Sequence, residues 1–400
     1  MTVLIAGAGP AGSRLAIRLA GAGFDVVLAD RLETPQRNAF SSAALPLRDA
    51  DRLSIPRSCR SAEWMGWQLV DPMALEHQWW ADQTLGVVLD FGLLRTALWQ
   101  EARQAGVELL SGCKVSAERL DQSQASLSLT FRNGQRQKRE VRWLIDATGA
   151  RRDLLHQTGI STSLESDPLL NGIGAEWLIQ ADDHQSARWR DRITFFLGTR
   201  WIPHGYGWVF PMGNHQLKVG VCRLTPPDLQ RHSWGLSRFL VETLRFCGLE
   251  GCPVLDRHGG AVVSSVARRE PHGAGALLAV GDAASSANLL GGEGIRHAFD
   301  SADQLAEVLI EQGTSHGMSV SETVRSQYRN KQLQRWGWRW EVAGRLARRT
   351  WFGLNDDRAD QRLSRLISGL STSASAEVLS ELLFGYQFER YGLRLLPYLI

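Results

Sequence analysis

The first thirty residues constrain the fold more than any other stretch of this 400-residue chain. Val3-Leu4-Ile5-Ala6 reads as a buried parallel strand, and a GxGxxG turn at 7–12 leads into a helical pattern that ends at the glycines of 21–23. A second apolar strand at 25–29 follows, and Asp30 closes it. A lone GxGxxG is weak evidence. Placed between a strand and a helix, with a second strand and an acid behind it, the motif predicts a dinucleotide-binding unit.

Each part of this unit has a physical role. Gly7 permits the tight turn, Gly9 lets the backbone approach a pyrophosphate, and Gly12 lets the helix pack close to the strand. The free N–H groups and positive dipole at the helix start attract phosphates. Asp30 can accept hydrogen bonds from ribose hydroxyls, and its charge disfavours the 2′-phosphate of NADP. The cofactor contacts predicted here are Gly7, Gly9, Pro10, Ala11, Gly12, Asp30 and Arg31.

A second glycine-rich motif, about 270 residues later, indicates which dinucleotide binds. A strand at 276–280 ends in Gly-Asp, and a glycine loop at 291–295 leads into a helix that runs to about Glu311. The Gly-Asp carboxylate can bind a ribitol hydroxyl. The loop and the helix start can reach the pyrimidine edge of a flavin, where the dipole stabilises the anionic reduced form. Between the two motifs, a strand at 143–146 ends in Asp-Ala-Thr-Gly. The further predicted contacts are Asp146, Gly149, Gly281, Asp282, Gly291, Gly292, Gly294 and Ile295.

Together, GxGxxG, Asp-Ala-Thr-Gly and Gly-Asp-Ala-Ala resemble the FAD-binding scaffold shared by aromatic hydroxylases, flavin halogenases and geranylgeranyl reductases. The resemblance covers roughly residues 1–50, 90–155 and 266–312. It implies FAD as the cofactor and an α/β fold. We expect a Rossmann-type FAD-binding domain with a β-meander formed by strands at 126–131 and 137–146. An antiparallel β-sheet substrate domain and C-terminal helices complete the expected fold.

The domain boundaries follow from these motifs. The FAD-binding domain is expected to comprise residues 1–60, 90–160 and 266–312. The substrate domain is expected at 61–89 and 161–265, where alternating strands are frequent, and a helical region at 313–400.

The stretch Tyr206-Gly207-Trp208-Val209-Phe210-Pro211 fits YxWxFP. It resembles a motif of the geranylgeranyl reductases, where these residues line the substrate cavity. Because side chains alternate along a strand, Tyr206, Trp208 and Phe210 face one side together and are the predicted substrate-binding residues. The alternative is ordinary core packing of a strand. Residues 291–298 also resemble that family's flavin loop.

The resemblance implies hydride transfer from reduced FAD to a C=C bond of an apolar, isoprenoid-like substrate, which can be a lipid. Tyr206 and His297 are candidate proton donors. Three alternatives stay open: a flavin-dependent monooxygenase, a binding protein without turnover, and a non-redox enzyme like the carotenoid cyclases, with Glu293 as the acid. A halogenase needs a lysine before the meander, and this chain has none before Lys114. The segment 41–46 lacks the cysteine that the reductases often carry.

Net charge and cysteine content limit the classes of partner and the cellular location that we expect. A net charge of +3 disfavours a strongly electrostatic nucleic-acid binder. Five cysteines without a CxxC pair predict neither disulfides nor a metal site, and they favour a reducing, cytoplasmic location. There is no second GxGxxG for a separate NADPH domain. NADPH or a protein such as ferredoxin is therefore expected to reach the flavin from outside.

The C-terminal region combines tryptophan and arginine at helical spacing over residues 325–351. Such a helix either packs its tryptophans on the FAD domain or lies on an anionic lipid surface, which makes a peripheral membrane location the alternative. A second apolar helical stretch, 379–400, is expected to close the substrate cavity. No apolar run is long enough to span a membrane.

Overall fold

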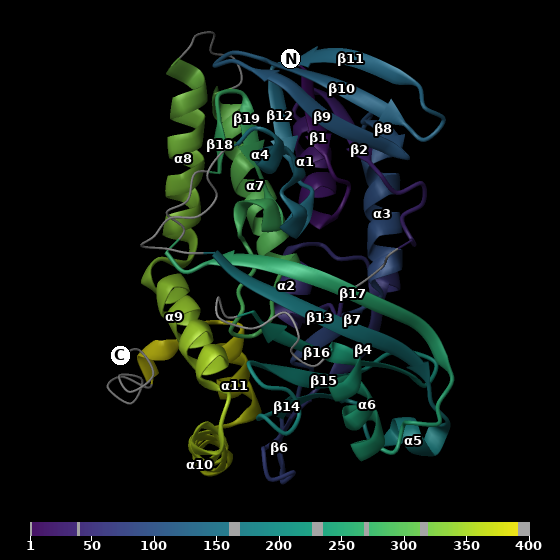
Figure 1. Cartoon of the computed structure of the whole chain (residues 1–400), viewed down its shortest axis with the longest axis vertical. Coiled ribbons are helices and arrows are strands. Elements are labelled where there is room, and N and C mark those ends of the chain that lie inside the picture. The colour runs from purple at the N-terminus through teal and green to yellow at the C-terminus, as the bar shows by residue number, and fades with distance from the viewer. Residues whose placement is uncertain are drawn as a thin grey trace.

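The computed structural model describes residues 2–37, 41–159, 169–225, 235–267, 272–312 and 319–390. Two halves are stacked along the long axis, with a parallel sheet in one and a larger, mainly antiparallel sheet in the other (Figure 1). Helices of the C-terminal region run down one side of both halves. This arrangement confirms the predicted α/β fold class.

A six-stranded sheet forms the centre of the first half. In spatial order its strands are β18 (Gly273–Ala274), β19 (Leu277–Ala279), β12 (Trp143–Asp146), β1 (Thr2–Ala6), β2 (Asp25–Asp30) and β8 (Glu108–Ser111). All neighbours pair in parallel except β18 with β19. Parallel pairing brings the carboxyl ends of β1, β12 and β19 to one edge, so the three predicted turns come together there.

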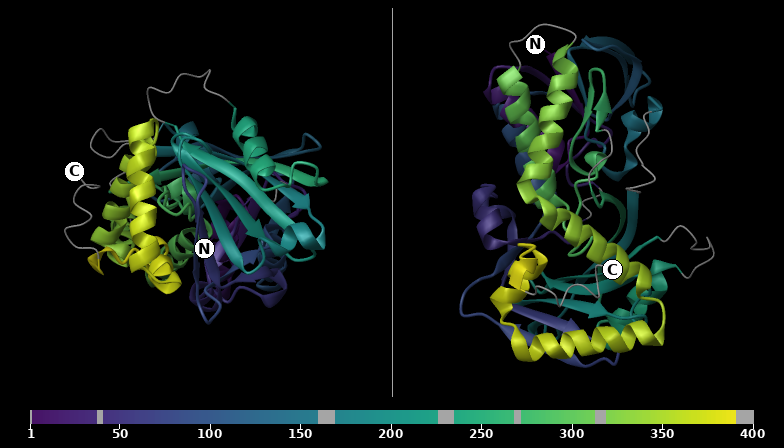
Figure 2. Two further views of the ribbon diagram at one scale, coloured as in Figure 1. Left: turned by 90° about the horizontal axis from the view of Figure 1, so that it is seen from below. Right: turned by 90° about the vertical axis from the view of Figure 1, so that its left-hand side faces the viewer.

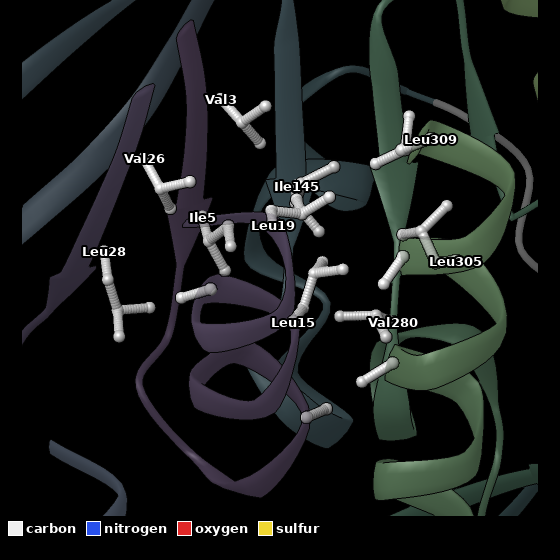
Figure 3. Close-up of a cluster of buried hydrophobic side chains, with 14 of the residues drawn as sticks. Val3, Ile5, Leu15, Leu19, Val26, Leu28, Ile145, Val280, Leu305 and Leu309 are labelled. Carbon is white, nitrogen blue, oxygen red and sulfur yellow. The ribbon is translucent and has the colours of Figure 1, made fainter. Parts of the chain in front are cut away.

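The core of this half lies between the sheet and the helices α1 (Pro10–Gly21), α3 (Phe91–Gln104) and α7 (Ile295–Gln312). Figure 3 shows side chains of β1 and β2 facing Leu15 and Leu19 of α1, with Leu305 and Leu309 of α7 beside them. Strands covered on both faces need unbroken apolar runs, which is why the opening strand lacks alternation.

A three-stranded antiparallel sheet covers the other face of the parallel sheet. It consists of β9 (Cys113–Leu120), β10 (Ala125–Phe131) and β11 (Arg136–Val141). The prediction of one strand over 137–146 is wrong, because β11 ends at Val141 and β12 begins in the parallel sheet at Trp143. The sequence changes there from exposed alternation to four buried residues. Arg142 marks the switch, and its backbone N–H donates to the carbonyl of Thr2 at 3.0 Å.

The second half is built on a seven-stranded sheet. In spatial order its strands are β17 (Val254–Ser265), β13 (Leu169–Gln180), β16 (Gln216–Leu224), β15 (Gly205–Pro211), β14 (Arg192–Leu197), β5 (Gly66–Val70) and β6 (Glu76–Trp80). A small sheet of β3 (Ala44–Pro46), β7 (Gly86–Leu89) and β4 (Arg60–Trp64) lies next to the seven-stranded sheet. Helix α6 (Leu236–Phe246) packs on β16 and β13, on the outer face of the seven-stranded sheet.

The segment 325–351, expected as one helix, is two helices. Helix α8 (Ser319–Trp336) runs beside α7, and α9 (Trp338–Gly353) crosses to the antiparallel sheet (Figure 2). Gly337, with a φ of +53°, makes the break. Trp340 and Trp351 are buried, whereas Trp338 is 54% exposed. The tryptophans therefore pack mostly inward, and those of α9 reach both halves rather than the FAD domain alone.

Helices α10 (Asp357–Ser373) and α11 (Ala376–Leu383) follow, and α10 lies across the end of the molecule next to β6 (Figure 2). Of the predicted apolar tail 379–400, α11 and a short 3-10 turn at Phe388–Arg390 are seen. Residues 391–400 lie outside the described part of the chain. Among the described helices, none has both the length and the apolar character required to cross a bilayer.

Candidate active site

A cavity of about 310 Å³ lies where the two halves meet. Its lining comes from both, and most of the predicted site residues belong to it. These are Gly9, Pro10, Ala11, Gly149, Tyr206, Trp208, Phe210, Gly281, Asp282, Gly291, Gly292, Glu293, Gly294 and Ile295. The predicted residues outside the lining are Gly7, Gly12, Asp30, Arg31, Asp146 and His297.

The first glycine-rich turn is shaped by close backbone contacts. A Cβ on Gly12 would lie 1.9 Å from the carbonyl oxygen of Gly7, and one on Gly7 would lie 2.3 Å from that of Ala147. Gly9 differs, since a Cβ there would meet nothing within 4 Å. Gly9 is also the N-cap of α1, and no side chain caps that helix start. The uncapped N–H groups beside an open backbone fit the pyrophosphate of FAD.

The carboxylate of Asp30 holds this turn in place by hydrogen bonds to backbone N–H groups. Its Oδ2 accepts from the N–H of Ala8 at 2.6 Å, and its Oδ1 accepts from the N–H of Leu32 at 2.8 Å. Each carboxylate oxygen can accept a second hydrogen bond, so the predicted ribose contact remains sterically compatible with this arrangement. Arg31 is exposed next to it.

The two distant glycine motifs meet directly. Gly281, with a φ of +66°, lies against α1, and a Cβ on it would be 2.8 Å from the Cβ of Ala11. Asp282 follows in the cavity wall. Burial raises the pKa of Asp282 to about 7, and the charge of Arg152 opposes this rise. A buried carboxyl group at this point is a suitable partner for a polyol hydroxyl of the cofactor.

Asp146 ends β12 as predicted but lies outside the cavity lining. Its side chain is fully buried, and its oxygens accept from the N–H groups of Leu154 and Leu155 and from both the N–H and the hydroxyl of Thr148. All of these bonds tie β12 to the turn and short helix that follow it. The carboxylate therefore has a structural role in this turn, and its contact with a cofactor stays a prediction.

The loop before α7 is closed by a pair of backbone hydrogen bonds. Asn288 and Glu293 exchange N–H···O bonds of 2.8 and 2.9 Å, which turns Gly291 and Gly292 toward the cavity. Trp351 of α9 donates its indole N–H to the carbonyl of Leu289 at 2.9 Å. The C-terminal helices therefore hold the predicted flavin loop in place.

The opposite wall is the aromatic face of β15. Tyr206, Trp208 and Phe210 all point into the cavity, and each is less than 10% exposed. The hydroxyl of Tyr206 reaches the loop, where a Cβ on Gly292 would lie 2.0 Å from it. Trp208 lies flat over Gly220 of the neighbouring strand, and a Cβ on Gly220 would be 2.1 Å from its ring. An apolar chain or ring fits such a wall.

Two buried ionisable side chains behind this wall, Glu176 and Lys218, were not predicted from the sequence. Glu176 of β13 accepts from the indole N–H of Trp208 at 2.9 Å. Burial raises the pKa of Glu176 and lowers that of Lys218, and each opposes the shift of the other by its charge. Lys218 donates to the carbonyls of Ser41 and Leu89, at 2.8 and 3.0 Å, and so joins the seven-stranded sheet to the end of β7 and to the segment before β3.

A thiol also lies in the cavity, although the segment 41–46 has none. Cys222 of β16 is the cross-strand partner of Tyr206, so the two side chains lie on the same face of the sheet. Burial raises the pKa of Cys222 to about 12 and also raises the pKa of Tyr206, so both stay protonated at neutral pH. The sequence contained one signal for the position of Cys222. Lys218, Gly220 and Cys222 occupy alternate positions of β16, so their side chains lie on the same face of that strand.

Among the described residues, Glu293 is, with Asp282, one of two carboxyl groups in the cavity lining whose pKa is raised to about 7. Burial raises its pKa to about 7, whereas Arg296 and the hydroxyl of Tyr386 oppose that rise. Both partners contact its Oε1, Arg296 at 2.8 Å and Tyr386 at 2.9 Å. His297 lies behind Glu293, outside the lining, and is 2% exposed.

No family model matches the chain. Over 368 residues it is 26% identical to digeranylgeranylglycerophospholipid reductase 1 of Methanococcoides burtonii, which covers 90% of this chain and 85% of the relative. It is 27% identical to a menaquinone reductase of Mycobacterium tuberculosis over 355 residues, 77% of this chain and 76% of the relative.

The fold is shared with solved structures. A geranylgeranyl bacteriochlorophyll reductase-like protein from Thermoplasma acidophilum superimposes with a TM-score of 0.83 at 21% identity, over 100% of this chain and 99% of the other. The similarity therefore extends through both halves and the C-terminal helices. In sequence the chain is thus similar to proteins named as reductases, and in fold it is similar to a geranylgeranyl bacteriochlorophyll reductase-like protein.

Proposed function

We propose that this protein reduces C=C bonds of an apolar, prenyl-like substrate. The observation that carries the proposal is the shared cavity, in which two glycine-rich loops face an aromatic wall and a buried carboxyl group. The names of two similar reductases support the proposal. One names a digeranylgeranyl glycerophospholipid as the compound reduced, and the other names menaquinone.

The residues at the loops would hold FAD across the two motifs. The start of α1 at Gly9 takes the pyrophosphate, Asp30 the ribose, Asp282 the ribitol chain, and the loop 291–295 the ring. When bound, FAD supplies the hydride from its reduced ring. NADPH or ferredoxin is the proposed external reductant.

The aromatic wall orients the substrate and excludes water. Tyr206 and Trp208 pack with ring centroids 6.0 Å apart, and Trp351 of α9 lies 5.1 Å from Tyr206. A rigid apolar surface next to the flavin loop favours a near-attack position of an alkene. Glu176 fixes the indole of Trp208 through its hydrogen bond.

Glu293 is the proposed proton donor to the second carbon of the double bond. It lines the cavity, and its pKa of about 7 leaves a substantial fraction protonated at neutral pH. Tyr206 is the second candidate among the cavity residues, but its raised pKa makes proton loss costly. The cyclase-like alternative would also use Glu293 as an acid, and it differs in leaving the mass of the substrate unchanged.

The direct test is incubation of the flavin-loaded protein with dithionite and a geranylgeranyl lipid under argon. Mass spectrometry should show a gain of two hydrogens for each saturated bond. A product of unchanged mass would favour the cyclase-like reaction, and substrate-dependent oxygen uptake in air would favour a monooxygenase. Either result would overturn the proposal, as would the absence of any product.

A further inference from the structure

A line of hydrogen bonds leads from the cavity into the C-terminal region. The hydroxyl of Tyr386 donates to Oε1 of Glu293 at 2.9 Å, and Nε2 of His297 lies 2.8 Å from the same hydroxyl. A phenol has one proton, and here it points to Glu293. When the phenol donates to Glu293, its oxygen accepts from His297, whose Nε2 then carries the proton. The three groups are aligned for transfer toward the cavity.

All three groups are shielded from bulk water. Glu293 is 6% exposed, His297 2% and Tyr386 0%. The imidazole packs edge-on against Trp336 and Trp340, with ring centroids 5.5 and 5.0 Å away, and stacks on Tyr386. A carboxylate left by proton transfer in such surroundings depends on neighbouring side chains for its next proton.

Arg296 fixes Glu293 but cannot supply that proton. It contacts Glu293 and also donates to Asp49 at 3.0 Å and to the carbonyl of Phe384 at 2.7 Å. A guanidinium group does not lose its proton in proteins, so its role is to hold the carboxyl group in position. Among the hydrogen-bonded partners that the described residues give Glu293, the phenol of Tyr386 is the group that can pass a proton on.

The backbone at Tyr386 shows that its placement is costly. Its φ is +52°, a left-handed conformation that residues with a Cβ rarely adopt. Strain of this kind, of order 1–3 kcal/mol, persists where the surrounding structure over-determines it and is concentrated at functional sites. Here the turn after α11 is held by the bond from Arg296 to Phe384.

We propose that Tyr386 and His297 form a proton relay that reloads Glu293 after each reduction. This inference rests on the proposed function. In one turnover, hydride from the reduced flavin and the proton of Glu293 add across the C=C bond, leaving oxidised flavin and a carboxylate. Tyr386 then passes its phenol proton to Glu293 and takes the Nε2 proton of His297, while Nδ1 of His297 takes up a proton from water, so that the imidazole stays neutral. Tyr386 acts through Glu293 and is a positioning residue rather than a catalytic one.

The test is Tyr386→Phe in the flavin-loaded, full-length protein, because phenylalanine keeps the ring packing and removes the hydroxyl. The first turnover of the dithionite-reduced protein should keep its rate within about twofold, since Glu293 is already protonated. Later turnovers should slow by at least about tenfold, within the range of general acid–base effects. His297→Gln should give the same split. A merely structural role would slow the first turnover equally, and an unchanged steady-state rate would also overturn the relay.

Tyr328→Phe provides the matched control, because Tyr328 is a buried tyrosine of α8 in the core next to α7. Both phases should keep their rates in this variant. If Tyr328→Phe shows the same split as Tyr386→Phe, the effect is a general consequence of losing a buried phenol, and the relay is wrong.

A second readout needs no substrate. The carboxylic acid C=O band of Glu293, assigned by its loss in Glu293→Gln, can be titrated by infrared difference spectroscopy in flavin-free and flavin-loaded protein. Removing the Tyr386 hydroxyl takes away a hydrogen bond that stabilises the carboxylate, so the titration midpoint should move to higher pH. An unmoved midpoint contradicts the hydrogen bond itself. Failure of the wild type to reduce any prenyl substrate would refute the proposed function and leave this titration valid.

Discussion

The two sides of the cavity are built by different means. The cofactor side depends on the backbone, since Gly7 and Gly12 lie where no Cβ fits. The substrate side depends on side chains, since Trp208 is held by Glu176 and the Glu176–Lys218 pair lies beneath it. Where the backbone leaves no room for a Cβ, only glycine is possible, so this kind of constraint can be recognised as a short motif in the sequence. A side-chain constraint is met by partners far apart in the chain.

The largest effect should come from Gly12→Val. Its side chain would enter space that the carbonyl of Gly7 fills, so we expect no folded, flavin-binding protein, as measured by circular dichroism and flavin absorbance. Gly9→Ala is the matched control. Its Cβ meets nothing, so the thermal midpoint should stay unchanged while flavin affinity falls. If Gly12→Val binds flavin normally, the backbone account of this side is wrong.

Lys218→Met tests the hydrogen bonds by which β16, on the substrate side, is connected to the carbonyls of Ser41 and Leu89. It removes the donor to the carbonyls of Ser41 and Leu89 and the positive charge that opposes the raised pKa of Glu176, which should lower the free energy of unfolding by about 1–3 kcal/mol in a urea titration. The double variant Glu176→Gln with Lys218→Met should recover part of that loss, because it also removes the buried carboxyl group. Strict additivity of the two single losses would show that the pair is not coupled.

Trp208→Phe keeps an aromatic wall and removes one hydrogen bond. Glu176 then loses the indole donor, and we expect a loss of about 2 kcal/mol in unfolding free energy with flavin absorbance retained. Trp338→Phe, at a tryptophan that is 54% exposed, should change stability by less than about 0.5 kcal/mol. Equal effects at the two positions would mean that the buried bond contributes nothing.

The smallest effect concerns the pH dependence. Because the raised pKa of Glu293 is about 7, its acid form is present below that pH and is lost as the pH rises through it. The reduction rate should therefore fall by about tenfold for each pH unit above this point, equivalent to about 1.4 kcal/mol. Stopped-flow reoxidation of the reduced flavin by substrate measures it. Glu293→Gln should be slow at every pH, and a wild-type reduction rate in that variant would exclude Glu293 as the acid.

Sequence reasoning identified the cofactor side more fully than the substrate side. The turns at Gly9 and Gly281 were recognisable because strand, turn and helix follow one another within about thirty residues. The sequence could not show that these turns touch, although their motifs imply a shared cofactor. Asp146 illustrates the limit, since an acid at a strand end can equally well face the cofactor or cap the following turn.

The unpredicted residues depend on tertiary contacts alone. Tyr386 reaches Glu293 from 93 residues away, and Glu176 meets Trp208 across a central strand of the sheet. Neither contact has a local signature, because one needs the helix break at Gly337 and the other needs the strand register. YxWxFP predicted the face of β15 correctly because alternation is a property of the strand itself.

The strand order of the parallel sheet also limits how the protein can be made. Its middle strand, β1, is synthesised first, but its neighbour β12 comes from residues 143–146 and β19 from 277–279. At about 5–20 residues per second, the opening apolar strand leaves the ribosome tens of seconds before the sheet can be completed. During that interval the edge of β1 that later pairs with β12 is open in the nascent chain, so ribosome-associated chaperones should matter more to this protein than its size alone suggests.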